Sequence, residues 1–169
     1  MASPNPKDVQ VVNEHLVQCL RDSVMVINQT QIVHWGLLGS KFYQIHLLTG
    51  DIQNEMVEGI DNIAEHIRSI NVMTPASVVD LLSSRLKDID VSDPFDQDKI
   101  ILDLSTAHDM LASFFEELAK YAGMVGDDFT QDLAVERGRV HKKNQWHLRA
   151  TMTYMTTNKE RTDVEEGKS

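Results

Sequence analysis

The sequence predicts an all-α fold of four long helices, and three observations support this prediction. Apolar residues recur at intervals of three or four along four long stretches, which is the helical period. The 169 residues include only four prolines and eight glycines, several of them between these stretches, and no segment alternates convincingly as a β-strand. This length suits one domain with a substantial core. We therefore expect one helical domain over residues 7–155, flanked by flexible polar tails at 1–6 and 156–169.

The first two helices are expected at about residues 7–35 and 41–71. Pro4 and Pro6 precede the first helix, and a glycine-containing turn over residues 36–40 separates the two. The second helix carries a regular stripe of apolar residues, namely Ile45, Leu48, Ile52, Met56, Ile60, Ile63, Ile67 and Ile70. This stripe is expected to face the core.

The connection that follows the second helix is too long for a simple turn between antiparallel neighbours and must contain structure of its own. Thr74 as a cap and Pro75 at the first helical position predict a short helix over 75–86. A third long helix is expected over about 96–124. A fourth, capped by Asp127 or Asp128, is expected to run to about residue 154.

Two pairs of polar residues on and before the second helix have the chemistry of metal ligands. Asp61 and Glu65 stand four residues apart, a spacing at which like charges disfavour a helix unless a cation joins them. His34 ends the first helix, and the turn after it folds the chain back to the height of His46. Two imidazoles and two carboxylates suit Fe(II) or Zn(II).

One chain alone is not expected to bring both pairs to the same ion. At ~1.5 Å per residue, His46 and Asp61 lie roughly 22 Å apart along one helix. If the helix packs antiparallel against its copy across a two-fold axis, His46 of one chain meets Asp61 and Glu65 of the other. The spacing predicts that the two helices cross midway, near Asn54 and Glu55.

These residues also carry a resemblance to a known family. The HW pair at His34 and Trp35, then Gly39, Phe42 and His46, and the DNIAEHIR segment at 61–68 resemble the Dps mini-ferritins in order and spacing. The similarity extends from about residue 11 to residue 152. It implies a ferritin-like four-helix bundle with a short extra helix in the crossover between the second and third helices, a hollow dodecamer, and ferroxidase sites shared between two-fold-related subunits.

The resemblance also implies an activity: Fe(II) is oxidised by hydrogen peroxide or oxygen and stored as ferric mineral, which protects against oxidative stress. Catalysis and metal binding would rest on His34, His46, Asp61 and Glu65, with zinc as a possible competitor. The carboxylates would favour Fe(III), and the imidazoles would bind Fe(II) before oxidation. Trp35 abuts this site, where it either intercepts a radical or buries an amphipathic ring.

The chain departs from the family pattern at Gly50. Typical members carry an acidic residue four positions after the second histidine, and glycine offers no ligand there. The neighbouring Asp51 is rotated by about 100° around the helix. We therefore expect a weaker second iron position.

A second acidic group lies at the start of the fourth helix. Asp127, Asp132 and Glu136 form a row there, and Dps relatives place a similar GDxxTxD segment around three-fold pores that admit iron. The alternative is helix capping with exposed charge.

Charge and compartment set further expectations. The formal net charge of −10 and the shortage of lysines in the tails argue against DNA coating, the main rival function. Basic residues gather on the fourth helix, at Arg137, Arg139, Lys142, Lys143 and Arg149, but their spacing scatters them around it.

The polar amino terminus, the single Cys19 and the lack of a long apolar run favour a cytoplasmic protein with no membrane span. Cys19 is expected to be buried. A third reading of the function is a metal-holding scaffold with little turnover. His15 and His108 are interpreted as structural, and the six-residue spacing of His141 and His147 argues against a metal shared by those two.

Overall fold

The computed structural model describes residues 5–166, with side chains described as far as residue 152. The helices are α1 (Pro6–Gly36), α2 (Phe42–Ser69), α3 (Val78–Leu81), α4 (Gln97–Val125) and α5 (Asp128–Glu166). Residues 5–166 contain no strand. The predicted all-α class, with four long helices and a short one in the crossover, is confirmed. The tail predictions for residues 1–4 and 167–169 lie outside the described residues.

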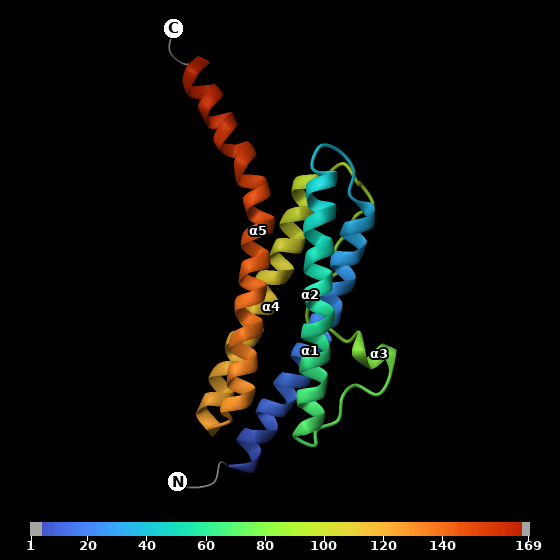
Figure 1. Cartoon of the computed structure of the whole chain (residues 1–169), viewed down its shortest axis with the longest axis vertical. Coiled ribbons are helices and arrows are strands. Elements are labelled where there is room, and N and C mark those ends of the chain that lie inside the picture. Colours follow the sequence, from blue (N-terminus) through green and yellow to red (C-terminus); the bar gives the residue numbers. More distant parts are fainter. Residues whose placement is uncertain (1–4, 167–169) are drawn as a thin grey trace.

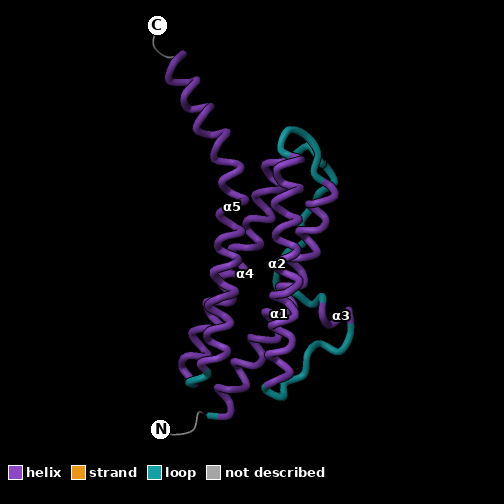
Figure 2. The backbone as a smooth tube through the Cα atoms, in the orientation of Figure 1, coloured by secondary structure: helices purple, strands orange, loops and turns teal. Residues whose placement is uncertain are grey.

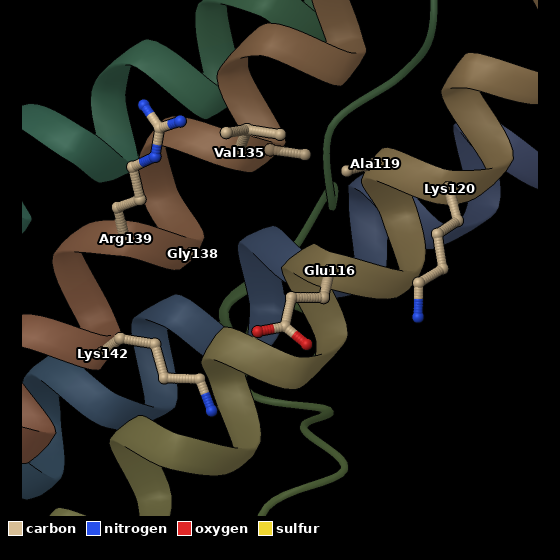
Figure 3. Close-up of a pocket in the computed structure, with 8 residues that line it drawn as sticks. Glu116, Ala119, Lys120, Val135, Gly138, Arg139 and Lys142 are labelled. Carbon is tan, nitrogen blue, oxygen red and sulfur yellow. The ribbon is translucent and has the colours of Figure 1, made fainter.

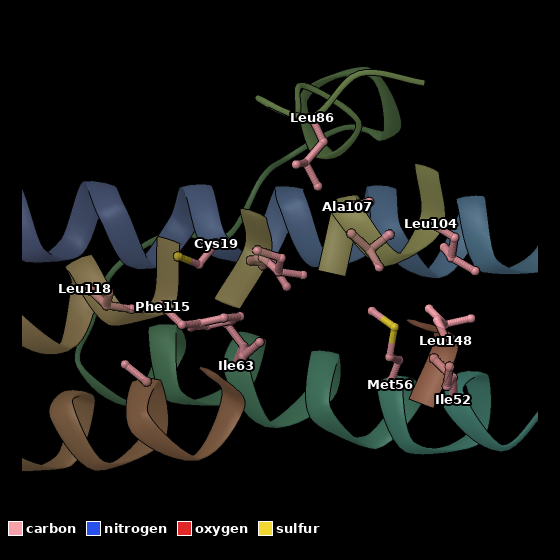
Figure 4. Close-up of a cluster of buried hydrophobic side chains, with 14 of the residues drawn as sticks. Cys19, Ile52, Met56, Ile63, Leu86, Leu104, Ala107, Phe115, Leu118 and Leu148 are labelled. Atoms are coloured by element: carbon pink, nitrogen blue, oxygen red, sulfur yellow. The ribbon is translucent and has the colours of Figure 1, made fainter. Parts of the chain in front are cut away.

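The four long helices pack side by side as a bundle (Figures 1 and 2). α1 packs against both α2 and α4, and α4 packs along α5. Fully buried side chains from all four helices meet between them, including Cys19, Met56, Ile63 and Phe115 (Figure 4). Each large aliphatic or aromatic side chain buried in this way contributes about 1.5–3 kcal/mol. Cys19 is buried as predicted, and its burial raises the pKa of the thiol to about 12.

Local capping fixes where the long helices begin and end. α1 starts one residue earlier than predicted, because Pro6 occupies the first helical position and the Asn5 side chain accepts a hydrogen bond from the backbone N–H of Lys7 (3.1 Å). α4 ends at Gly126, whose φ of 73° is a left-handed conformation that favours glycine.

The crossover helix is much shorter than predicted. The expected helix over 75–86 with Thr74 as its cap is wrong, since α3 covers only one turn. Ser77 is the cap, because its hydroxyl accepts from the backbone N–H of Asp80 (3.1 Å). A Ser and a Thr both precede the apolar run, and the sequence alone does not rank them.

Buried and half-buried charges explain why the crossover stops being helical. Asp22, which is fully buried in α1, accepts hydrogen bonds from the Ser84 hydroxyl (2.8 Å) and from the backbone N–H and guanidinium of Arg85 (2.6–2.8 Å). Arg21 holds Asp80 in the same way (2.7 Å). These tertiary bonds take the backbone donor of Arg85 away from a helix.

The fourth helix continues beyond the predicted end at residue 154. The predicted helix end is wrong, because α5 ends at Glu166; the expectation of a flexible polar tail over 156–169 stays a prediction. Loss of apolar periodicity means that a segment does not bury a face, but it does not terminate a helix, and no Pro or Gly interrupts residues 139–166. The carboxyl-terminal part of α5 accordingly extends away from the other helices (Figure 1).

Two histidines meet in the core between α4 and α5. His108 and His141 are both fully buried, with their Nδ1 atoms 3.0 Å apart, and the ring of Phe115 stacks on His141. Neither Nε2 atom has a hydrogen-bond partner among the described residues. The sequence did not predict that these two histidines are in contact, because they lie 33 residues apart. Desolvation lowers the pKa of His108 to about 3 and that of His141 well below its usual range.

This pair predicts loss of stability in mild acid. A histidine with a lowered native pKa binds fewer protons folded than unfolded, so stability falls as the pH drops below about 6.5. Both histidines contribute to this loss, since burial lowers the pKa of each. Replacing both residues with glutamine is expected to flatten the melting temperature between pH 7 and pH 4, measured by circular dichroism. An equal acid loss in the parent and in the double variant would contradict this assignment.

Candidate metal centre

The turn between α1 and α2 sets the height at which the two predicted imidazole ligands stand. Gly39 has a φ of 106°, and a Cβ there would collide with the side chain of Gln97. Gln97 in turn accepts a hydrogen bond from the backbone N–H of Lys41 (2.7 Å), and the backbone N–H of Leu38 donates to Pro94 (2.9 Å). The start of α4 therefore fixes the turn, and α2 runs back along α1.

His34 and His46 meet as the turn predicts. Their rings stack with centroids 3.8 Å apart and planes 21° apart. The Nδ1 of His46 donates to the backbone carbonyl of His34 (3.1 Å), since a carbonyl only accepts. The Nδ1 of His34 lies 2.9 Å from the hydroxyl of Thr49. Both Nδ1 atoms are thus engaged, which leaves the Nε2 atoms as the ligand positions.

The charge state of His34 also suits a ligand. Partial burial lowers its pKa, and the neighbouring His46 lowers it further, against a smaller opposing effect of their hydrogen bond. A neutral imidazole keeps the lone pair that a metal needs.

The predicted carboxylates lie elsewhere on α2. Asp61 and Glu65 are exposed, one turn apart. The helix carries them roughly 22 Å from His46 at ~1.5 Å per residue. Among the side chains described up to residue 152, no three His, Cys, Asp or Glu residues gather as a metal site would require. Each chain therefore presents an imidazole pair and a carboxylate pair, held apart by one rigid helix.

A largely apolar groove lies along α2 and reaches the carboxylate pair at Asp61. Asn54, Val57, Glu58, Ile60, Asp61 and Ala64 line it on the outer side of α2. Val57 is 62% exposed, which is a large apolar exposure in the middle of a helix. The groove includes Asn54, where the predicted two-fold crossing lies.

Comparisons with known proteins identify the family and the fold. The family model described as a ferritin-like domain matches residues 13–157. The chain belongs to the ferritin-like family. It is 22% identical to the DNA protection during starvation protein of Listeria innocua, over 89% of this chain and 95% of the relative. It is 24% identical to the protein of the same name from Helicobacter pylori, over 76% of this chain and 90% of that one.

Solved structures show the same fold. Antigen TpF1 of Treponema pallidum superposes with a TM-score of 0.81 at 23% identity, covering 89% of this chain and 98% of that one. A Dps protein of Vibrio cholerae, described as belonging to a broad superfamily of ferritin-like diiron-carboxylate proteins, gives a TM-score of 0.78 at 22% identity over 90% and 98% of the two chains. The Dps resemblance and the ferritin-like bundle are both confirmed. No helix among the described residues is long and apolar enough to span a membrane.

Other residues implied by the ferritin-like resemblance are placed as follows. Trp35 follows His34 but is 71% exposed in the single chain. Asp127 caps α5, since its side chain accepts from the backbone N–H of Thr130 (3.1 Å). Asp132 and Glu136 lie one turn apart on α5, exposed.

The basic residues of α5 are partly neutralised within the chain. Arg137 is buried and forms an ion pair with Glu55 of α2, and Lys142 pairs with Asp109 of α4 (2.8 Å). Arg139 and Lys142 border a groove between α4 and α5 whose other wall carries Glu116 (Figure 3). This mixture of charges is a poor match for a phosphate backbone.

The space beside Gly50 is open toward the imidazoles. A Cβ at this position would meet only the Cε1 of His34, at 3.6 Å, which is an ordinary contact. The glycine therefore withholds a ligand at a point where a side chain would fit.

This geometry predicts unequal metal binding. The parent protein is expected to bind about one tight Zn(II) per site and a much weaker second ion, because four protein ligands suffice for one well-bound ion. Gly50→Asp adds a carboxylate one turn from His46 and should tighten the second ion by about tenfold, or ~1.4 kcal/mol. Isothermal titration calorimetry measures both steps.

Gly50→Ala is the matched control for this titration. It adds the Cβ and the helix propensity without the carboxylate, so it should raise stability by up to ~1 kcal/mol and leave the second ion weak. Two equally tight ions in the parent would contradict the prediction.

Proposed function

We propose that the protein is a ferroxidase and iron store. Fe(II) is oxidised by hydrogen peroxide or oxygen at sites between subunits and is deposited as ferric mineral inside a hollow dodecamer in the cytoplasm. The observation that carries this proposal is the separation of four candidate ligands into an imidazole pair, where α1 meets the start of α2, and an exposed carboxylate pair near the end of α2. This separation is what an inter-subunit site of the Dps type requires.

Antiparallel pairing of two α2 helices completes the site. With the crossing near Asn54, His34 and His46 of one subunit approach Asp61 and Glu65 of the other, and the two-fold axis generates two identical sites. The exposed Val57 and the apolar groove supply surface to bury at the crossing.

The residues divide the chemical work. The imidazole Nε2 atoms bind Fe(II) as neutral ligands, and the carboxylates add the negative charge that favours Fe(III). Two Fe(II) ions each give up one electron, and one hydrogen peroxide takes both electrons with two protons to form two water molecules. The net acidic chain concentrates the cation.

Two other functions are less well supported. A DNA-coating role conflicts with the net charge of −10 and with the pairing of Arg137 and Lys142 to acidic partners. A metal-holding scaffold with little turnover is favoured by Gly50 alone. Fe(II) oxidation, followed by the absorbance of ferric species with peroxide or with oxygen, separates the scaffold from the ferroxidase.

Mixed assemblies test whether the site is shared. One parent carries His34→Asn and His46→Asn, and the other carries Asp61→Asn and Glu65→Gln; each alone is expected to lose ferroxidase activity. When the two are co-expressed in equal amounts, half of the dimers are mixed and each mixed dimer regains one intact site. Activity should therefore return to about a quarter of the unmodified level.

The comparison is interpretable only between assemblies of equal mass, which light scattering establishes. Activity that stays at the level of the separate variants would show that all four residues act within one chain. Full inactivity of the unmodified protein with both oxidants would overturn the ferroxidase proposal itself.

The acidic row on α5 is proposed as the lining of an iron uptake pore. Asp127→Asn, Asp132→Asn and Glu136→Gln together remove its charge while keeping the cap on α5, since asparagine also caps helices. Iron uptake should slow several-fold at low salt and less at 0.1 M salt, where steering is screened within ~10 Å. Stopped-flow measurement of Fe(II) oxidation reports this. Equal low-salt rates in variant and parent would exclude the pore role.

A further inference from the structure

Thr49 holds the imidazole of His34 from inside the bundle. It is fully buried in α2, and its hydroxyl lies 2.9 Å from the Nδ1 of His34, which belongs to α1. The sequence did not predict a role for Thr49, because a threonine at a core position of a helix resembles a weakly apolar member of the buried stripe. Its partner lies 15 residues away on another helix.

The hydrogen of the Thr49 hydroxyl is already committed. The hydroxyl lies 2.7 Å from the carbonyl of Ile45 and 3.2 Å from that of His46, and both carbonyls can only accept. A hydroxyl has one proton to donate, and the shorter of these contacts takes it. The oxygen of Thr49 then accepts, so the Nδ1 of His34 must carry a proton.

A chain of three hydrogen bonds results. The Thr49 hydroxyl donates to Ile45, the Nδ1 of His34 donates to Thr49, and the Nδ1 of His46 donates to the carbonyl of His34 (3.1 Å). In a neutral imidazole with a protonated Nδ1, the lone pair is on Nε2. Both stacked rings are therefore set to the same tautomer.

One side-chain hydrogen bond, in addition to ring stacking, orients the ring of His34. One face of the ring stacks on His46, and its Cε1 atom borders the open space beside Gly50. A side chain at position 50 would be in contact with the imidazole, and glycine is not. Among the described residues, Thr49 provides the side-chain hydrogen bond to this ring.

We propose that Thr49 is a positioning residue that fixes His34 in the Nδ1-protonated tautomer and so presents its Nε2 to the metal. This inference rests on the proposed metal site but concerns the metal-free protein. Loss of such a partner behind a ligating histidine typically weakens metal affinity by 10- to 100-fold.

The test uses Thr49→Val, which keeps the shape and removes the hydroxyl, and Thr49→Ser, which restores it. Thr30→Val is the matched control: Thr30 is also fully buried and donates to the carbonyl four residues before it (2.7 Å), but no hydrogen bond joins it to a histidine among the described residues. All three and the parent are titrated with Zn(II) by calorimetry. In parallel, 15N-histidine spectra of the metal-free assemblies assign the tautomer of His34, identified by its loss in His34→Asn.

The expected result is a protonated Nδ1 on His34 in the parent, in Thr49→Ser and in Thr30→Val. In Thr49→Val that signal should change to the other tautomer or to a mixture, and Zn(II) should bind at least about tenfold more weakly. Restoration by serine and retention in Thr30→Val separate this effect from loss of a buried hydroxyl in general.

Two results overturn the proposal. If His34 carries its proton on Nε2 in the parent, or if Thr49→Val keeps both the parent tautomer and the parent affinity, Thr49 does not position the ring. A different result contradicts the proposed metal site: His46→Asn and Asp61→Asn each bind Zn(II) as tightly as the parent protein does. In that case the tautomer spectra still decide the role of Thr49.

Discussion

The rigidity of α2 is the constraint on which the candidate centre depends. A helix fixes the rise per residue, so its imidazole end and its carboxylate end are held apart by roughly 22 Å and do not approach each other by any local adjustment. The only low-cost way to bring His46 to a carboxylate pair of this kind is a second copy of the same helix. The proposed site therefore requires assembly, because the described part of one chain brings no three such ligands together.

The turn at Gly39 depends on an element far away in the sequence. Gly39 has a positive φ and lies against the side chain of Gln97. The end of α1, the start of α2 and the start of α4 therefore meet in one small region. Lys41 adds an ion pair to Asp98 there. The position of His34 relative to His46 along the bundle axis thus depends on α4, although α4 contributes none of the four candidate ligands. The bundle positions the imidazoles, and the exposed face of α2 positions the carboxylates.

Sequence reasoning predicted the features that follow from local period and from turn chemistry. The four long helices and the meeting of His34 with His46 belong to this group. It failed where tertiary bonds decide: Asp22 pulls the crossover out of a helix at Arg85, and the pairing of His108 with His141 joins positions on two helices. The extension of α5 to Glu166 was missed because the loss of apolar periodicity was taken for the end of the helix.

Thr49 and Gly50 are neighbours on α2, and both lie close to the imidazole of His34. A carboxylate at position 50 would lie against the imidazole of His34 and serve as a ligand at the same time. In this chain, the neutral hydroxyl of Thr49 holds the ring from the core side, and Gly50 has no side chain that could act as a ligand. A neutral partner does not add the negative charge that stabilises a second cation. If the proposed site binds metal, this arrangement keeps the imidazole geometry for a first ion and lacks the charge that a second ion needs, which is a difference in charge rather than in fold.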